Sequence, residues 1–502
     1  NLVATYQGAP VELSGSIGDI EQWYANEPTP ISLQGRLNAA DLRLEGSAGP
    51  MLPDPNARID ISLTTADIST FEPFAGVELP ALQGLDVSLT FLAADGQLAT
   101  ENVALNLDDP RLLVALQGAV ANLTEMSGID VQAEITSEQA TELLQGFDLP
   151  AQYSLPESIR LKAAVNGNLQ QLAVNDLELL VKDTGLDLSL TGSVENVLGN
   201  GSGSADLSVK LESSSLIGGY IGQEIPSFGP FDAVATLSSE NKTLQLESLQ
   251  IGLQDPALNV EIEGSAEKID RSAADAFEVS GIQISATAAT QQIQEIVNRF
   301  GVDIPVELPS TFNLSLDSAG SLDELEITDL LATVNDPGVE LKLSGTVANV
   351  IDQSGIAAHL TGAVEDTAIL SKFAGVEIPA LGTLTLDSNL SSADDSYTLD
   401  DLELKLDGEL IKAKINAAIA DLMALTKVSD GNEAYAQAGI NVSVDMESGA
   451  LDELGTLAGV DTIPDLGTLT VQGELVSSDT SLALENLDLA LSGDTVEAAV
   501  KA

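Results

Sequence analysis

The stretch LALENLDLAL at residues 482–491 alternates apolar and polar residues, but the alternation slips by one residue in its middle. Leucines at 482 and 484 are followed by Glu485 and Asn486, and leucines resume at 487, 489 and 491. Alternation with a period of two predicts a β-strand with one apolar face. An extra residue at a β-bulge bends the strand and keeps the later leucines on that face, whereas a straight strand would turn them away. We therefore predict a bulge at Glu485-Asn486.

The slipped pattern occurs six times along the chain. The other five copies are LATENVALNL (98–107), LAVNDLELLV (172–181), LQLESLQIGL (244–253), LEITDLLATV (325–334) and YTLDDLELKL (397–406). The pair at the slip is polar in each copy, which predicts further bulges at Glu101-Asn102, Asn175-Asp176, Glu247-Ser248, Thr328-Asp329 and Asp400-Asp401. This recurrence indicates a repeat array, which reaches 502 residues by addition rather than by separate domains.

Each repeat has the same order of predicted elements. A Leu-Pro or Ile-Pro pair recurs about every 70–85 residues, at 79–80, 149–150, 225–226, 304–305, 378–379 and 463–464. A first strand, the slipped second strand, a turn with Asp, Gly or Pro, a third strand, a fourth strand and a short amphipathic helix then follow. The third strand carries an interior glycine at 118, 192, 264 and 345, replaced by Asn416 in one repeat, which predicts a bend or a close approach.

The repeats also define the expected domain organisation. Residues 1–70 predict a degenerate N-terminal repeat with an extra hairpin near 31–46. Residues 71–502 predict a six-fold repeat array, continuous with it and truncated in its last repeat, so that we expect one continuous elongated domain. Extra residues such as 270–278 and 426–438 fall between the third and fourth strands, which predicts that insertions gather on one rim.

The composition is both very acidic and apolar. The chain has 78 acidic and 19 basic residues, a net charge of −59, and 44% hydrophobic residues, of which few are aromatic. This charge argues against binding to nucleic acid and against an electrostatic grip on anionic lipid surfaces. The acidic and apolar characters must lie on opposite faces, and the apolar face must be aliphatic. No cysteine is present, which excludes disulfides, and no stretch is long and apolar enough for a membrane-spanning helix.

Residues for catalysis or metal binding are scarce. His359 is the one histidine and is expected on the surface of a strand, since a lone histidine forms neither a metal site nor a catalytic triad. The acidic pairs 394–395 and 400–401 lack the spaced ligands of a calcium loop, and GNGSGS at 199–204 lacks the lysine of a phosphate loop. We expect no enzyme activity, no metal and no cofactor.

The aliphatic face is the candidate binding site. The strand pattern predicts that the following residues share one face, which makes them the candidate lining of a lipid groove if that face stays open: Leu105, Leu107, Val114, Leu116, Leu179, Val181, Leu249, Ile251, Leu253, Val260, Ile262, Leu341, Leu343, Leu402, Leu404, Leu487 and Leu489. The pattern alone leaves two uses open. The face either fills a closed β core or stays exposed as a trough for an apolar ligand.

Several segments resemble the bacterial AsmA-like family. They are ISLQGRLNAADLRLEGSAGP (31–50), the stretch 57–91, FAGVEIPALGTLTLDSNL (373–390) and LAGVDTIPDLGTLTVQGEL (457–475), and the chain order of helix, Pro-x-Leu-Gly, strand, bulged strand and a strand such as GTVANV (345–350) is similar too. The resemblance implies an elongated antiparallel β-sheet repeat array, bent into an open groove, with one short amphipathic helix per repeat.

The resemblance also implies a function. It predicts a periplasmic protein, anchored in the inner membrane by a segment outside residues 1–502, whose hydrophobic groove binds phospholipid acyl chains and conducts them between the inner and outer membranes. The expected partners are a phospholipid or other acyl-chain lipid and the inner membrane. The alternative is a secreted or surface structural repeat protein, similar to an adhesin stalk, with a closed β core.

Overall fold

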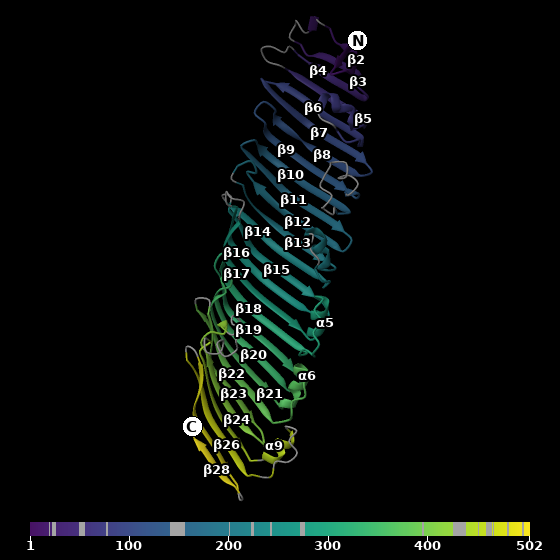
Figure 1. Cartoon of the computed structure of the whole chain (residues 1–502). Helices are drawn as coiled ribbons and strands as arrows, with labels where there is room; N and C mark the ends of the chain where they lie inside the picture. Colours follow the sequence, from purple (N-terminus) through teal and green to yellow (C-terminus); the bar gives the residue numbers. More distant parts are fainter. Residues whose placement is uncertain are drawn as a thin grey trace. The chain divides into compact units, whose positions relative to one another are not determined.

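The structure is a computed structural model of the chain. It describes residues 1–502 except 20, 23–26, 50–55, 77–78, 141–155, 200, 222–224, 241–242, 272–276, 394–395, 425–437, 450, 458–463, 465, 479–480, 494–495 and 502. The protein is mainly β, with 68% of residues in strands and 9% in helices. The 28 strands of the described residues belong to a single antiparallel sheet that is not closed into a barrel, which confirms the predicted open repeat sheet (Figure 1).

The chain divides into two compact units. Unit 1 comprises Asn1–Leu249 with Lys268–Asp270, and unit 2 comprises Gln250–Glu267 with Arg271–Ala502. The division falls inside a strand of the third full repeat and not at residue 70, where the N-terminal repeat was predicted to end. That all repeats form one continuous domain stays a prediction. Within each unit, successive strands pair with each other as far as β14 and again from β17 onward, always antiparallel.

Unit 1 contains the N-terminal strands and the first two full repeats. Its strands are β1 (Leu2–Tyr6), β2 (Ala9–Ile17), β3 (Thr29–Leu37), β4 (Ala40–Ala48), β5 (Ala57–Asp67), β6 (Gln83–Ala94), β7 (Gln97–Asp109), β8 (Leu112–Asn122), β9 (Ser127–Ser137), β10 (Ser158–Asn168), β11 (Gln171–Asp183), β12 (Leu186–Glu195), β13 (Ser202–Leu211) and β14 (Phe231–Glu240). Its helices are η1 (Ile68–Phe71), α2 (Glu72–Ala75) and α4 (Ser215–Ile221). The β3–β4 pair is the extra hairpin predicted near residues 31–46, and it lies between β2 and β5.

Unit 2 contains the later repeats, and β15 (Thr243–Gln254) and β16 (Asn259–Arg271) each contribute residues to both units. Its other strands are β17 (Phe277–Thr290), β18 (Thr311–Ser321), β19 (Leu325–Asp336), β20 (Val339–Asn349), β21 (Ser354–Val364), β22 (Thr383–Ala393), β23 (Ser396–Asp407), β24 (Lys412–Ile419), β25 (Ile440–Ser448), β26 (Thr468–Ser478), β27 (Ser481–Ser492) and β28 (Glu497–Lys501). Its helices are α5 (Ile293–Arg299), η2 (Thr367–Leu370), α6 (Ser371–Ala374) and α9 (Leu451–Leu457).

The predicted order of elements is confirmed in the described repeats. Four strands are followed by a helix in β10–β13 with α4, β14–β17 with α5, β18–β21 with η2 and α6, and β22–β25 with α9. In unit 2, Figure 1 shows α5, α6 and α9 on the same side of the sheet, where the fourth strand of each repeat ends. The helix predicted over 137–145 in the first full repeat lies largely outside the described residues.

The predicted bulges are confirmed in five of the six second strands. In β7, Thr100 opposes Val120 and Val103 opposes Gly118, so two residues of β7 face only Ala119 of β8. The same register shift occurs in β11, β19, β23 and β27. The third strand β8 has no bulge, so Gly118 and Val120, two residues apart, point to one face. Their partners on β7, Val103 and Thr100, are three residues apart and yet point to that same face. The bulge thus keeps both halves of the second strand on the same face.

The second residue of the polar pair makes the bend in four repeats. Asn102, Asp176, Asp401 and Asn486 all have φ of 50–51°, in the left-handed region. Asparagine and aspartate tolerate this region better than other residues with a Cβ, which explains why these two types stand there. Asp329 has no positive φ, although its strand is also bulged, so the bulge of β19 has a different backbone geometry.

The third-strand glycines lie beside the bulges. Gly118, Gly192 and Gly345 oppose the first apolar residue after the bulge, and a Cβ on any of them would collide with a carbonyl oxygen of the fourth strand. The predicted close approach is therefore confirmed. One detail of the prediction was wrong: in the fifth repeat Leu402 opposes Ala417, not Asn416, because the turn before β24 is longer.

Candidate functional site

In unit 1, the strand register brings the predicted lining residues onto one face. Leu105 opposes Leu116, and Leu107 opposes Val114. The same row continues to β11, because Val114 opposes Ile135, Ile135 opposes Leu161 and Leu161 opposes Leu179; Val181 is two residues further along β11. Directly opposed residues of antiparallel strands point to the same face. These six residues therefore share one face, which we call the apolar face.

Unit 2 has an equivalent apolar face. Leu341 opposes Gly362, Gly362 opposes Leu386, and Leu386 opposes Leu404. From Leu404 the row continues through Ile415 to Val444, and Val471, beside that row, opposes Leu489. The other residues predicted in β20, β23 and β27, namely Leu343, Leu402 and Leu487, lie two residues along the same strands and join the face.

Residues in β15 and β16 are placed only along their own strands. Leu249, Ile251 and Leu253 alternate along β15, and Val260 and Ile262 alternate along β16. Each set therefore shares a face of its strand. The lining role of all seventeen residues stays a prediction.

The apolar face is only partly covered. Among the seventeen residues, Leu107 is buried, with 7% of its surface exposed, and the other sixteen are partly exposed. The buried hydrophobic residues of the described chain are mostly alanines near strand ends, such as the small cluster of Ala48, Ala57 and Ala93. All strands of the described chain belong to one sheet, so no second sheet covers this face. The aliphatic side chains of this face are therefore partly accessible within each unit.

Charged residues lie on the opposite face, which we call the polar face. Bases such as Arg160, Lys342 and Lys414 occupy strand positions next to apolar-face residues and therefore point away from them. Acids form ion pairs on this polar face. Glu134 pairs with Arg160 at 2.6 Å and Glu403 pairs with Lys414 at 2.5 Å. Hydrogen bonds from Arg160 and, for Glu403, first from Lys405 and then from Lys414 lower the pKa of both carboxyl groups.

Small residues line the apolar face where the strands bend. Opposite the bulge, the first strand of its repeat carries a small residue in three repeats, Ala163 in β10, Ser388 in β22 and Gly473 in β26, but Leu89 in β6. The third strand carries glycine or alanine at the same level, as described above. Side chains converge where a sheet bends, so the small third-strand residue makes room there, and in three repeats a small first-strand residue adds to it. The sequence prediction missed these first-strand positions.

One rim of the sheet is held by aspartates in the turns between second and third strands. Asp109 accepts hydrogen bonds from the backbone N–H groups of Gln83, at 2.9 Å, and Arg111, at 2.8 Å, and pairs with the Arg111 guanidinium at 3.0 Å. The Arg111 side chain, followed by these N–H groups, lowers the pKa of Asp109 to about 2, against the effect of burial. Asp255 pairs with Arg299 at 2.9 Å, and Asp336 pairs with Lys372. We call this edge the helix rim.

The opposite edge, which we call the hairpin rim, is held by local turn caps, neutral Asn in most repeats and Asp421 in one. The third-strand ends VANLT (120–124), VENVL (194–198), VANVI (347–351) and IADLM (419–423) share one pattern. In three of these turns the Asn or Asp side chain accepts a hydrogen bond from the backbone N–H two residues ahead, as in Thr124 N to Asn122 Oδ1 at 3.0 Å and Ile351 N to Asn349 Oδ1 at 2.9 Å, whereas Asn196 Oδ1 is buried without a partner. The last residue of the pattern is exposed in all four turns, most strongly Leu198 at 61% and Ile351 at 57%. The sequence segment GTVANV (345–350) was recognised as part of the repeat, but the exposure of the last residue of the turn pattern was not predicted.

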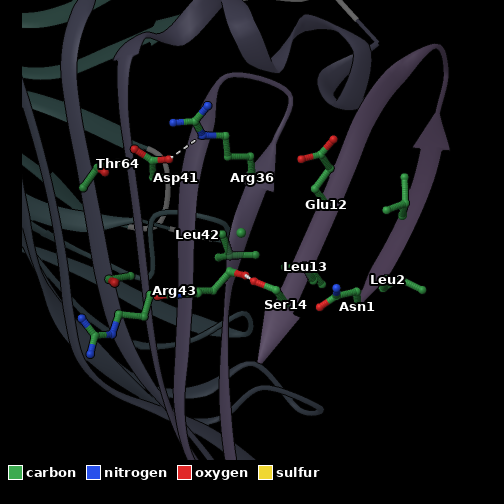
Figure 2. A pocket seen from close by; sticks show the side chains of 14 residues that line it. Asn1, Leu2, Glu12, Leu13, Ser14, Arg36, Asp41, Leu42, Arg43 and Thr64 are labelled. Carbon is green, nitrogen blue, oxygen red and sulfur yellow. Dashed lines mark hydrogen bonds and ion pairs between the residues drawn. The ribbon is translucent and has the colours of Figure 1, made fainter. Parts of the chain in front are cut away.

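The polar face of β1–β5 contains a shallow cavity of about 690 Å³ (Figure 2). Its lining includes Glu12, Arg36, Asp41 and Arg43, and the two arginines are already paired, Arg36 with Asp41 at 3.0 Å and Arg43 with Glu45 at 2.5 Å. This cavity is therefore separate from the apolar face. A second cavity, of about 440 Å³ between β8 and β11, is also lined mainly by polar-face residues.

The described residues offer no candidate metal site. No group of three or more histidines, aspartates and glutamates there is arranged to hold a metal ion. His359 lies on the polar face of β21, where its Nδ1 is 3.0 Å from Asn389 Oδ1 and its Nε2 is 3.6 Å from Asp387 Oδ2. None of the helices in the described ranges is long and apolar enough to cross a membrane.

Comparisons with known proteins were made by family model and by sequence. No family model matches the chain, and no curated protein matches it significantly. The resemblance to the AsmA-like family therefore stays a prediction from the sequence segments.

Proposed function

We propose that this protein is a non-enzymatic hydrophobic groove that binds the acyl chains of phospholipids and lets them move along the apolar face. The single observation that carries this proposal is the character of that face. It is aliphatic, partly exposed and free of charged strand residues wherever the register is known, with aspartates only at the turns of the helix rim. An exposed apolar surface larger than a few hundred Å² marks a binding surface.

The energetics support acyl chains as the ligand. Burial of apolar surface stabilises by about 25 cal/mol per Å², so a 16-carbon chain laid on the face gains roughly 10 kcal/mol before the costs of binding. Because no charged strand residue interrupts the path where the register is known, and an acyl chain offers no hydrogen-bonding group, no position along the path holds the chain by a directional bond. Movement along the face then exchanges one aliphatic contact for another of similar strength.

The cellular setting of the proposal rests on the sequence resemblance. We propose a periplasmic location, anchorage in the inner membrane through a segment outside residues 1–502, and transfer of lipid between the inner and outer membranes. No metal or cofactor is required for this role, and the polar face supplies the water-compatible surface.

The alternative, a structural repeat protein, required a closed β core. The sheet is not closed, and the predicted lining residues stay partly exposed, which favours the groove. Co-purification separates the two functions. The purified full chain is expected to carry phospholipid, detected by mass spectrometry of an organic extract, whereas a structural array would carry none.

A charge on the path tests the conduit directly. Leu404→Asp and Ile251→Asp each place an unpaired carboxylate on an aliphatic row, which costs several kcal/mol when lipid covers it. We expect photo-crosslinking of lipid near the new charge to fall by at least about tenfold. Thr385→Asp is the matched control, because Thr385 is exposed on the polar face and opposes Lys405. Normal crosslinking on both sides of the charge in a folded Leu404→Asp protein would contradict the conduit.

A further inference from the structure

The apolar face has no group that can hold a lipid headgroup. Every base on a strand of known register lies on the polar face, and Arg111 lies in a turn of the helix rim. The turn aspartates at the helix rim are engaged, Asp109 with Arg111 and Asp336 with Lys372. A phospholipid whose acyl chains lie on the apolar face must therefore place its headgroup at a rim.

The helix rim offers carboxylates but no unpaired base among its described residues. Arg299 pairs with Asp255 at 2.9 Å and with Glu295 at 2.6 Å, and Lys372 pairs with Asp336. Asp303, Glu307 and Glu377 are exposed in the segments that follow α5 and α6, and none of them has a basic partner in the described chain. These segments adjoin, because Gly375 lies beside Val306 of the preceding repeat.

The hairpin rim is also acidic. Asp323 and Glu324 lie in the turn between β18 and β19, and Asp352 lies in the turn between β20 and β21. Asp352 accepts a hydrogen bond from Asn349 and has no basic partner among the described residues. Both rims of unit 2 therefore carry negative charge, in a chain whose net charge is −59.

We propose that the groove selects phospholipids with a zwitterionic headgroup that contains an ammonium group over phospholipids with an anionic headgroup. This inference rests on the proposed function and names the substrate class of the same site. The phosphate of either headgroup finds no unpaired base among the described rim residues of unit 2. An ammonium group finds carboxylates within reach of it, whereas an anionic headgroup adds a like charge to an acidic rim. The preference is electrostatic, so it weakens when salt shortens the screening length from about 20 Å or more to below 5 Å.

The experiment compares two photoactivatable phospholipids with identical acyl chains, one with a phosphocholine and one with a phosphoglycerol headgroup. The full chain is mixed with each probe in detergent micelles of a neutral sugar detergent, at 20 mM and at 500 mM NaCl, and the fraction crosslinked is measured. We expect the zwitterionic probe to label at least about fivefold more at low salt, and the ratio to fall below about twofold at high salt. Equal labelling at low salt, or more labelling by the anionic probe, would overturn the inference. If neither probe labels the protein, the conduit proposal itself fails.

A rim variant tests the location of the effect. The triple substitution Asp303→Asn, Glu307→Gln and Glu377→Gln removes three charges from the helix rim. Its matched control, Glu326→Gln, Asp329→Asn and Glu340→Gln, removes three charges from the polar face or the bulge of the same unit. We expect the rim variant to raise labelling by the anionic probe by about threefold at low salt and the control to change it by less than about 1.5-fold. An equal rise in both variants would show that net charge, and not the rim, decides, and would overturn the assignment.

Discussion

The two rims of the sheet end the same strands but are held by different chemistry. At the helix rim, a buried carboxylate such as Asp109 joins the β7–β8 turn to Gln83 at the start of the preceding strand β6, through a backbone hydrogen bond, and pairs with Arg111 within the turn. At the hairpin rim, a neutral Asn122 or Asn349 side chain closes the turn locally. Charge-assisted bonds are roughly twice as strong as neutral ones, and they respond to pH. The comparison indicates that contacts at the helix rim hold a turn against the neighbouring strand. Contacts at the hairpin rim stabilise only the turn in which they lie.

The largest effect is expected from removing the carboxylate contacts of Asp109 at the helix rim. Asp109→Ala leaves the Gln83 and Arg111 N–H groups without their acceptor and the Arg111 guanidinium without its carboxylate. We expect the free energy of local opening of the β7–β8 hairpin to fall by about 3 kcal/mol, measured by hydrogen exchange of its backbone amides. Asp108→Ala is the control, since Asp108 is exposed, and a change below about 0.5 kcal/mol is expected. Equal effects of the two substitutions would contradict a special role for Asp109.

The second prediction uses pH on the same site. The pKa of Asp109 is lowered from 3.8 to about 2, so its ionised form is stabilised by folding. This contribution, of about 2 kcal/mol, is fully present above pH 3.8 and is lost as the pH falls through 2. We expect the stability difference between wild type and Asp109→Asn to shrink over that range, followed by urea unfolding at pH 5, 4, 3 and 2. A difference that is constant with pH would argue against an ionised carboxylate at this rim.

The third prediction concerns the loss of a turn cap at the hairpin rim. Asn122→Ala removes the acceptor of the Thr124 and Glu125 N–H groups, both at 3.0 Å. Since the turn is partly exposed and water replaces the lost acceptor, we expect local destabilisation of only about 1 kcal/mol, without pH dependence between 3.8 and 2. Hydrogen exchange in the β8–β9 hairpin measures it, with Glu125→Gln as control. A loss as large as that of Asp109→Ala would remove the difference between the rims.

The smallest expected effect concerns the exposed tip of the hairpin rim. Ile351→Ser changes a side chain that is 57% exposed and leaves the Asn349 cap in place. We expect thermal stability to change by less than about 0.5 kcal/mol. A loss of 1 kcal/mol or more would show that this tip is packed, and that the hairpin rim relies on apolar contacts as well as on caps.

The parts of the fold that repeat over short distances were predictable from the sequence. Alternation with a period of two predicted the strands, and the slip at 485–486 and its copies predicted the bulges. Both were predictable because the face to which a side chain points depends only on the local register. The grouping of the lining residues within each unit followed for the same reason. The left-handed φ of Asn102 was not predicted, although the Asn or Asp at the second position of the pair was a signal for it.

Features that depend on residues distant in the chain were not predictable. Asp109 was recognised as a turn residue, but its bond to Gln83 joins residues 26 positions apart and depends on how the first strand returns to the turn. The place of Ala417 opposite Leu402 depends on the length of the turn before β24, which the glycine pattern misplaced by one residue. The coverage of the apolar face was undecided in the sequence, because alternation looks the same in a sandwich and in an open sheet.

The even number of strands in each repeat has a consequence for how such a chain can change in length. Antiparallel neighbours alternate in direction, so four strands return the chain to the edge from which it started, and every helix of unit 2 emerges on one side. A gene duplication that added one strand or three would send all later helices to the other edge. The extra β3–β4 hairpin adds two strands and preserves this parity. Insertion or deletion of paired strands is therefore the evolutionary step that leaves the rest of the array with its helices on the same edge.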